Sequence, residues 1–165
     1  MNSVICHTPL IDLKISQQHN QLCEIDFIHK TELDADHQQL SIVDPQGIED
    51  PLLQQALQQI LAYLKAPQFV FDLPLNPHGT RFQQSVWRYL RSIPAGEVRT
   101  YGEVAAALNS SPRAVGNACR RNPLPLVIPC HRVVSAAGIG GFSGHTAGTQ
   151  IDTKRQLLAH EGVEI

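Results

Sequence analysis

The sequence has little of what marks membrane-spanning, secreted or disulfide-held proteins. No apolar run approaches the length of about eighteen residues that a membrane-spanning helix needs. Residues 1–7 carry neither a basic stretch nor an apolar core, so we expect no secretory leader. There are only four cysteines, and none belongs to a C-x-x-C pair: Cys6, Cys23, Cys119 and Cys130. We therefore expect free thiols, a cytoplasmic location and no membrane contact.

Charged residues are also scarce, at 17% of the chain, and their distribution is uneven. Residues 1–76 hold ten acidic and only three basic side chains, whereas residues 77–165 hold ten basic and five acidic ones. A basic half is a hint of nucleic-acid contact, although chance segregation within a single domain gives the same pattern. With 165 residues, 42% of them hydrophobic, the chain can fold as one domain or two small ones.

The point where the charge changes sign is also the best candidate for a linker. Residues 74–80 are rich in proline and glycine, which favours an N-terminal domain at 1–76 and a C-terminal domain at 77–165. In the first domain, alternation of apolar and polar residues predicts antiparallel strands, and Asp50 followed by Pro51 is typical of a helix start. We expect strands at 10–16, 21–29 and 69–73, a turn at 44–47 and a helix at 50–65.

The second domain is predicted to be mainly helical. Thr100 and Glu103 form a potential capping box, while Ser111 and Pro112 suit the N-cap and N1 positions of the next helix. We expect helices at residues 80–93, 101–108, 112–121 and 150–160. The two short central helices, joined by a tight turn, resemble a helix-turn-helix, an arrangement that also occurs in proteins that never bind DNA.

The helix expected at 112–121 combines small and basic side chains. Ala114 and Gly116 are small, and Arg113 and Arg120 flank them. Glycine inside a helix costs about 1 kcal/mol relative to alanine, and close approach of another backbone would explain it. A DNA backbone and a neighbouring helix are both candidates.

Cys130 is the strongest candidate for chemistry. It follows a strand-like apolar segment, 126–129, and precedes His131 and Arg132. A cysteine attacks as its thiolate, and a nearby imidazole or cation lowers its pKa, provided that these side chains turn toward the sulfur. In an extended segment neighbouring side chains point to opposite faces, so a bridging water is needed in many geometries. A buried structural cysteine beside a surface histidine is the alternative interpretation.

A longer string around Cys130 decides between them. Residues 128–134, Ile-Pro-Cys-His-Arg-Val-Val, resemble the active-site motif of the O6-alkylguanine-DNA alkyltransferases, also called methylated-DNA–protein-cysteine methyltransferases. The resemblance covers most of residues 79–162 and includes the strings at 94–102, 113–116, 121–123 and 157–162. Over residues 1–78 it is limited to Thr8-Pro9-Leu10 and a strand pattern.

This resemblance implies an α/β (α+β) fold. A small N-terminal domain, ribonuclease H-like, would hold an antiparallel sheet, and a C-terminal, mainly helical domain would have a winged-helix or helix-turn-helix form. It implies direct repair of DNA by one irreversible transfer of an alkyl group from O6-alkylguanine, and from O4-alkylthymine, to Cys130. The lesion is the donor and the protein the acceptor, so no cofactor is expected. The expected partner is double-stranded DNA that contains O6-alkylguanine, bound by a monomer.

The resemblance also implies catalytic roles. Cys130 would be the alkyl acceptor, and His131 would act through a water as general base for the thiol, with Glu161 orienting the imidazole. Asn122 would hydrogen-bond near the thiol and hold the turn that positions it. Tyr101 would contact the phosphate of the flipped nucleotide and donate a proton as guanine leaves.

Binding roles follow in the same way. The reacting carbon lies inside the base stack, so the nucleotide must flip out, and Arg113 would fill the gap. Ala114, Gly116 and Arg120 would let the helix lie along the minor groove. The base pocket would be lined by Pro125, Val133, Phe142 and Ser143, with backbone N–H groups near Ser143 holding O6. Two positions depart from the family. The family often has tyrosine at the position of Phe142, and some members have a bulkier residue at the position of Cys119.

The same residues allow other functions. Zinc ligands are available in Cys6, His7, Cys23, His29 and His78, but their spacing matches no strong pattern, so we expect no metal. A helix-turn-helix regulator explains the charge split but not the string around Cys130. A cysteine hydrolase that uses Cys130 and His131 would turn over many times, whereas an alkyl acceptor reacts once.

Overall fold

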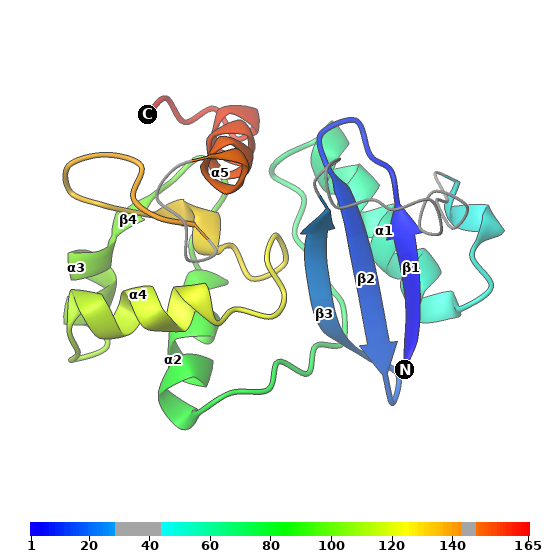
Figure 1. Ribbon diagram of the computed structural model, residues 1–165, viewed down its shortest axis with the longest axis horizontal. Helices are drawn as coiled ribbons and strands as arrows, with labels where there is room; N and C mark the ends of the chain where they lie inside the picture. Colours follow the sequence, from blue (N-terminus) through cyan, green and yellow to red (C-terminus); the bar gives the residue numbers. More distant parts are fainter. Residues whose placement is uncertain (29–43, 143–147) are drawn as a thin grey trace. The chain divides into compact units, whose positions relative to one another are not determined.

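Our computed structural model of the chain describes residues 1–28, 44–142 and 148–165 (Figure 1). These residues form two compact units, Met1–Pro77 and His78–Ile165. Residue 29, the last of the expected second strand, lies outside the described residues. None of the described helices is long and apolar enough to cross a membrane.

The first unit contains a three-stranded antiparallel sheet in the order β1 (Asn2–Cys6), β2 (Asp12–Gln18), β3 (Gln21–Ile28). Ile5 lies opposite Lys14, and Ile15 opposite Ile25. The predicted strands at 10–16 and 21–29 are confirmed. Strand β1 was not expected, because its apolar residues are consecutive rather than alternating, and only pairing with β2 makes it a strand.

Strand β3 contains a β-bulge that the alternation did not predict. Glu24 lies opposite Ser16, but Leu22 lies opposite Gln17, which leaves Cys23 as the extra residue. The bulge shifts the alternation of side chains between the two faces of the sheet by one residue, so that Leu22 and Ile25 are both buried.

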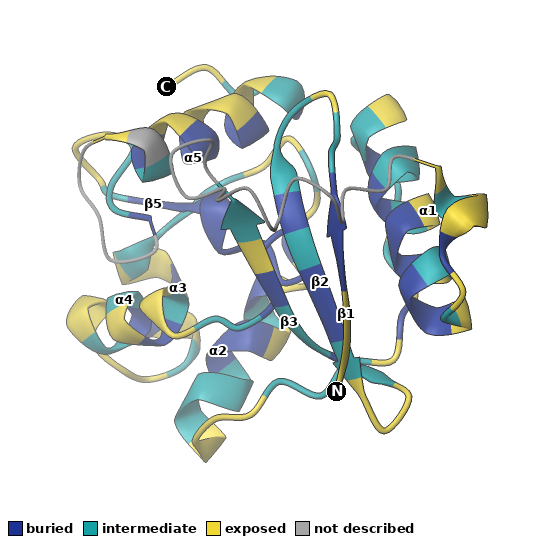
Figure 2. Ribbon diagram, turned by 45° about the vertical axis from the view of Figure 1, so that its right-hand side comes forward, coloured by how far each residue is buried: buried dark blue, intermediate teal, exposed yellow. Residues whose placement is uncertain are grey.

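Helix α1 (Pro51–Lys65) supplies the other part of this unit's core. As expected, Pro51 is its first residue, and the carboxylate of Asp50 caps it by accepting from two backbone N–H groups. One face of the helix is buried and contacts β1 and β2 (Figure 2). Its buried residues are Leu52, Leu53, Ala56, Leu57, Ile60 and Tyr63.

Two local predictions in this unit need correction. The turn at 44–47 forms, as a short 3-10 helix, η3 (Pro45–Gly47), capped by Asp44. The strand expected at 69–73 is wrong, because this segment is irregular. Its polar backbone is satisfied by a side chain instead of a ladder: the amide of Gln59 accepts from the N–H of Asp72 and donates to its carbonyl.

The second unit is mainly helical, as predicted. Its elements are α2 (Arg81–Leu90), β4 (Arg99–Thr100), α3 (Tyr101–Ala107), α4 (Pro112–Arg120), η4 (Cys130–Arg132), β5 (Val133–Val134) and α5 (Thr149–His160). Capping boxes start α2 at Thr80 and α3 at Thr100, and Ser111 caps α4. Helices α3 and α4 pack against each other across a tight turn, which confirms the helix-turn-helix.

Two features of this unit position the site. Helix α2 lies against α4, where the buried indole of Trp87 donates to the carbonyl of Ala118 at 2.8 Å. The two-residue strands β4 and β5 pair in parallel, with Thr100 opposite Val134. This ladder was not predicted, and it places the start of α3 beside the segment that leaves Cys130.

Candidate active site

The segment before Cys130 is a series of turns, so the strand expected at 126–129 is wrong. Leu126 has a left-handed φ of 77°, and the N–H of Ile128 donates to the carbonyl of Leu124 at 2.8 Å. The N–H of Cys130 then donates to the carbonyl of Ile128 at 2.8 Å, which closes a tight turn over Pro129. Residues 123–129 contain three prolines, which cannot donate to a sheet, so the apolar residues among them pack as turns.

Asn122 holds this series of turns at both ends. Its amide Nδ2 donates to the carbonyl of Ile128 at 2.8 Å, and its Oδ1 accepts from the N–H of Leu124 at 2.9 Å. The side chain therefore fixes the backbone immediately before the cysteine, where a left-handed non-glycine residue adds strain.

Cys130 begins the short helix η4 and is 7% exposed. Burial raises the pKa of its thiol, while the Asn122 side chain and the charge of Lys154 lower this pKa in part. The thiol is therefore protonated at rest. A reaction at this sulfur needs a base that removes the proton when the substrate is in place.

His131, the next residue, belongs to a buried hydrogen-bonded network. Its Nε2 lies 2.8 Å from Oε1 of Glu161, the C-cap residue of helix α5. Arg132 donates to both oxygens of the same carboxylate, at 3.0 Å from Nε and 2.8 Å from Nη2, and to the carbonyl of Ile93 at 2.6 Å. All three side chains are buried.

The carboxylate determines which imidazole nitrogen is free to act. Because Glu161 accepts at Nε2, the neutral imidazole carries its proton there and leaves Nδ1 as an acceptor. Within the described residues Nδ1 is buried and has no hydrogen-bond partner. Burial lowers the pKa of His131, so the ring is neutral. The arrangement therefore presents a bare, fixed base next to the cysteine.

The condition that Arg132 turns toward the sulfur is not met. Its guanidinium contacts Glu161 and the carbonyl of Ile93 instead. The cation whose charge acts on Cys130 is Lys154, which the sequence reasoning missed. A signal was present: Lys154 lies at helical spacing between Ile151 and Leu158, on the buried face of α5.

Tyr101, the first residue of α3, lies against the loop that follows β5. Its hydroxyl donates to the carbonyl of Gly141 at 3.4 Å, and burial raises the pKa of the phenol, which therefore keeps its proton. The loop passes close to the ring at Gly140, where φ is 75° and a Cβ would lie 3.1 Å from Tyr101 Cε2. Only glycine fits there.

Similarity to known proteins decides the family. The family model of the 6-O-methylguanine DNA methyltransferase DNA binding domain matches residues 81–163, and that of its ribonuclease-like domain matches residues 4–77. The chain belongs to the 6-O-methylguanine DNA methyltransferase family. The resemblance and the fold class expected from the sequence are both confirmed.

Individual relatives of this family agree. The constitutive methylated-DNA–protein-cysteine methyltransferase of Bacillus subtilis is 36% identical over 159 residues, 94% of this chain and 92% of the relative. The Methanosarcina acetivorans protein of that name is 43% identical over 115 residues, 68% of this chain and 71% of the relative. The crystal structure of Mycobacterium tuberculosis OGT in complex with DNA has a TM-score of 0.75 at 32% identity, covering 96% of this chain and 91% of that one.

The methyltransferase residues expected to line the base pocket are placed only in part. Pro125, Val133 and Phe142 are buried, and Val133 belongs to β5, directly after η4. Phe142 follows the carbonyl that accepts from Tyr101. Ser143 lies outside the described residues.

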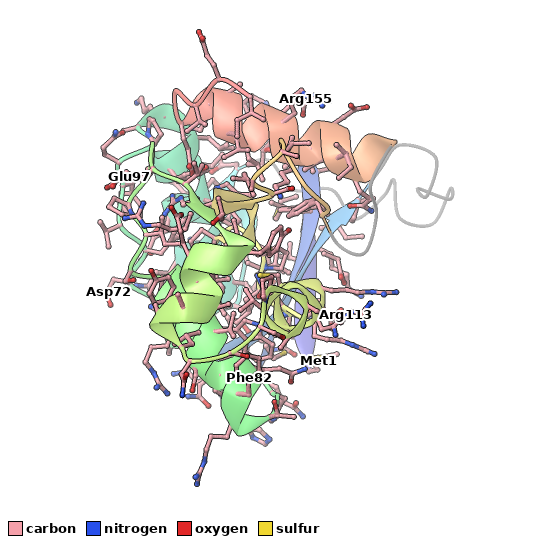
Figure 3. The ribbon with its side chains drawn as sticks, turned by 90° about the vertical axis from the view of Figure 1, so that its left-hand side faces the viewer. Met1, Asp72, Phe82, Glu97, Arg113 and Arg155 are labelled. Carbon is pink, nitrogen blue, oxygen red and sulfur yellow. The ribbon has the colours of Figure 1, made fainter. Side chains whose placement is uncertain are left out.

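The residues expected to contact DNA lie on helix α4. Arg113, labelled in Figure 3, is exposed. Arg120 is also exposed, and Ala114 and Gly116 are partly buried. A Cβ at Gly116 would meet only Cε1 of Tyr101 within 4 Å of the described chain, at 4.0 Å. No neighbouring helix backbone therefore requires this glycine, which favours the DNA-backbone explanation over the other.

The expected zinc candidates do not come together in the described part of the methyltransferase. No group of three or more His, Cys, Asp or Glu side chains there could hold a metal ion. Burial raises the pKa of Cys6 to about 12, and Nδ1 of His7 lies 2.9 Å from a carboxylate oxygen of Asp12. His29 lies outside the described residues.

Proposed function

We propose that Cys130 is the sulfur to which this methylated-DNA–protein-cysteine methyltransferase transfers the methyl group of O6-methylguanine. The observation that carries this assignment is the network beside it. A buried thiol is followed by a neutral imidazole, whose free Nδ1 is fixed by a carboxylate that is itself paired with an arginine. Of the other cysteines, Cys6 is also followed by a histidine, but the side chain of His7 is 36% exposed and its Nδ1 lies 2.9 Å from a carboxylate oxygen of Asp12.

In the proposed reaction His131 makes the nucleophile. The thiol proton of Cys130 passes through a water to Nδ1 of His131, and Glu161 stabilises the imidazolium that forms. The sulfur then attacks the methyl carbon, so that an S–C bond forms as the bond between carbon and O6 breaks. The electron pair of the broken bond remains on guanine.

Tyr101 completes the proton balance. Its phenol keeps its proton at rest, so it can donate this proton to the departing guanine anion, and the proton held by His131 restores the phenol. The net change replaces the S–H bond by S–CH3 and the methyl group of the base by a proton. No described group at the site can hydrolyse the thioether, so each molecule reacts once. The lesion is the donor and the protein the acceptor, so the proposed reaction needs no cofactor.

The proposal includes how the lesion reaches the sulfur. Arg113 and Arg120 are exposed on α4, whose small residues Ala114 and Gly116 let it approach the minor groove of double-stranded DNA. The damaged nucleotide flips into a pocket formed by Pro125, Val133, Phe142 and Ser143. The proposal also includes that the protein acts as a monomer in the cytoplasm, on O6-alkylguanine and on O4-alkylthymine. It further includes a division of tasks between domains at 1–76 and 77–165.

Mass measurement tests the proposed function. After incubation with duplex DNA carrying one O6-methylguanine, the intact protein is expected to gain the mass of one methylene group, located on the peptide that contains Cys130. The amount of repaired base should level off at one per protein molecule. Binding without a mass gain would indicate a regulator, and product in excess of protein would indicate a hydrolase.

Replacing Arg113 tests the flipping step. Arg113→Ala is expected to lower the rate of repair in duplex DNA by about tenfold or more, because nothing then fills the gap in the base stack. Reaction with the free base O6-methylguanine should stay unchanged, since no stack has to open. Arg155→Ala removes an equally exposed arginine from α5 and is the matched control (Figure 3). A parallel loss with the free base would contradict the assigned role.

A further inference from the structure

Lys154 is a buried charge that the proposed reaction leaves unused. The residue is 0% exposed, and its ammonium donates to the carbonyls of Val133 at 2.7 Å and Gly141 at 2.8 Å. It makes no ion pair with a carboxylate in the described part of the chain. A buried cation without a counter-ion is costly, so its position calls for a function.

The groups that face this ammonium belong to the active site. The ring of Tyr101 on α3 has its centroid 5.9 Å away. Cys130 on η4 and Cys119 on α4 both raise the pKa of Lys154, which burial lowers to about 8. The same charge acts on His131, whose pKa it helps to lower. A negative charge on Cys130 that could offset Lys154 exists only when the thiol has lost its proton.

The two carbonyls give the ammonium a second task. Val133 directly follows η4, and Gly141 lies at the far end of the loop that leaves β5. The carbonyl of Gly141 also accepts from the hydroxyl of Tyr101 at 3.4 Å. One ammonium thus connects strand β5, which follows the nucleophile, with the loop before Phe142 and, through the Gly141 carbonyl, with the proposed proton donor Tyr101.

We propose that Lys154 is a positioning residue for methyl transfer: it holds the Gly141 carbonyl against β5 and supplies the positive charge that stabilises the Cys130 thiolate as its proton leaves. This inference rests on the proposed function, because it requires Cys130 to be the acceptor. The acting cation comes from α5, far from Cys130 in the sequence.

The pH dependence of single-turnover repair tests this role. In the wild-type protein the rate is expected to fall above about pH 8, where Lys154 loses its charge. Burial keeps the pKa values of Cys130, Cys119 and Tyr101 above their usual ranges, and that of His131 below its own, so none of these accounts for a fall there.

Three variants separate the charge from the packing. Lys154→Met keeps a side chain of similar length but removes the charge. At neutral pH this variant should react at least about tenfold more slowly, and its rate should not fall above pH 8. Lys154→Arg keeps a charge that does not titrate, so its rate should stay near the wild-type value and the alkaline fall should vanish. Lys154→Gln replaces the methionine variant if that protein does not fold.

The outcomes distinguish this inference from the proposed function. A wild-type rate without an alkaline fall overturns the role of Lys154, and so does a Lys154→Met protein that is slower by the same factor at every pH and keeps the fall. In each experiment the methylated peptide is identified by mass. If the methyl group is found on a residue other than Cys130, the proposed function itself fails.

Discussion

Replacement of Cys130 by serine is expected to abolish methyl transfer. A hydroxyl is a far weaker nucleophile than a thiolate, and the imidazole of His131 cannot compensate for that difference. Loss of a nucleophile in an enzyme of this kind lowers the rate by a factor on the order of 10⁴ or more. The intact mass of Cys130→Ser should therefore stay unchanged after prolonged exposure to DNA containing O6-methylguanine. The repaired base should be undetectable.

A second cysteine provides the matched control for this experiment. Cys119 lies on α4, and the charge of Cys130 acts on its pKa, so it shares the same surroundings. Cys119→Ser should still gain one methyl group, because it leaves the thiol of Cys130 and the neighbouring imidazole of His131 unchanged. Thermal unfolding of both variants shows that the fold survives. A methyl group on Cys119 in the Cys130→Ser protein would mean that any thiol in this region can act as acceptor.

The expected loss should leave DNA binding intact. Cys130 is 7% exposed, whereas the arginines proposed to contact DNA lie on the exposed side of α4. Cys130→Ser should therefore bind lesion-containing duplex as tightly as the wild-type protein, with an affinity that falls as salt is added. That result would show that binding and transfer depend on different parts of the same unit.

Local signals predicted the helices of this protein well. Thr80, Thr100 and Ser111 each satisfy the first N–H groups of a helix, which needs only residues a few positions away. The β4–β5 ladder depends on a partner distant in the sequence, and β1 lacks an alternating pattern of its own, so neither was indicated by a local signal. Residues 126–129 suggested a strand because they form an apolar run, but the prolines at 123, 125 and 129 and the amide of Asn122 make the segment turn.

The sequence predicted which residues form the candidate site better than it predicted the contacts between them. The resemblance named Cys130, His131 and Glu161, and the structure brings the last two to 2.8 Å. The direction of Arg132 could not be read from its neighbour in sequence, because the carboxylate that it contacts lies 29 residues away. Lys154 was overlooked because a lysine in a helix is usually solvated, and its burial is visible only when Ile151 and Leu158 are placed on the same face.

Glu161→Gln is expected to cost both stability and activity. The carboxylate accepts from Nε2 of His131 and from Nε and Nη2 of Arg132, and its side chain is 0% exposed. A neutral amide leaves the guanidinium buried without its counter-ion and turns an N–H2 group toward other donors. Breaking a buried ion pair on one side costs about 3–5 kcal/mol in the free energy of unfolding. Chemical denaturation of wild type and variant measures this difference.

A double variant separates the two losses. When Arg132→Met is combined with Glu161→Leu, both charges are replaced by apolar side chains of similar size, so most of the lost stability should return. Activity should not return, because Nε2 of His131 no longer has an acceptor to fix its tautomer, and a general base contributes about 10²–10⁴-fold to a rate. A stable double variant with wild-type transfer would show that the network serves the fold alone. A stable, inactive one would show that the carboxylate acts on the reaction through the imidazole.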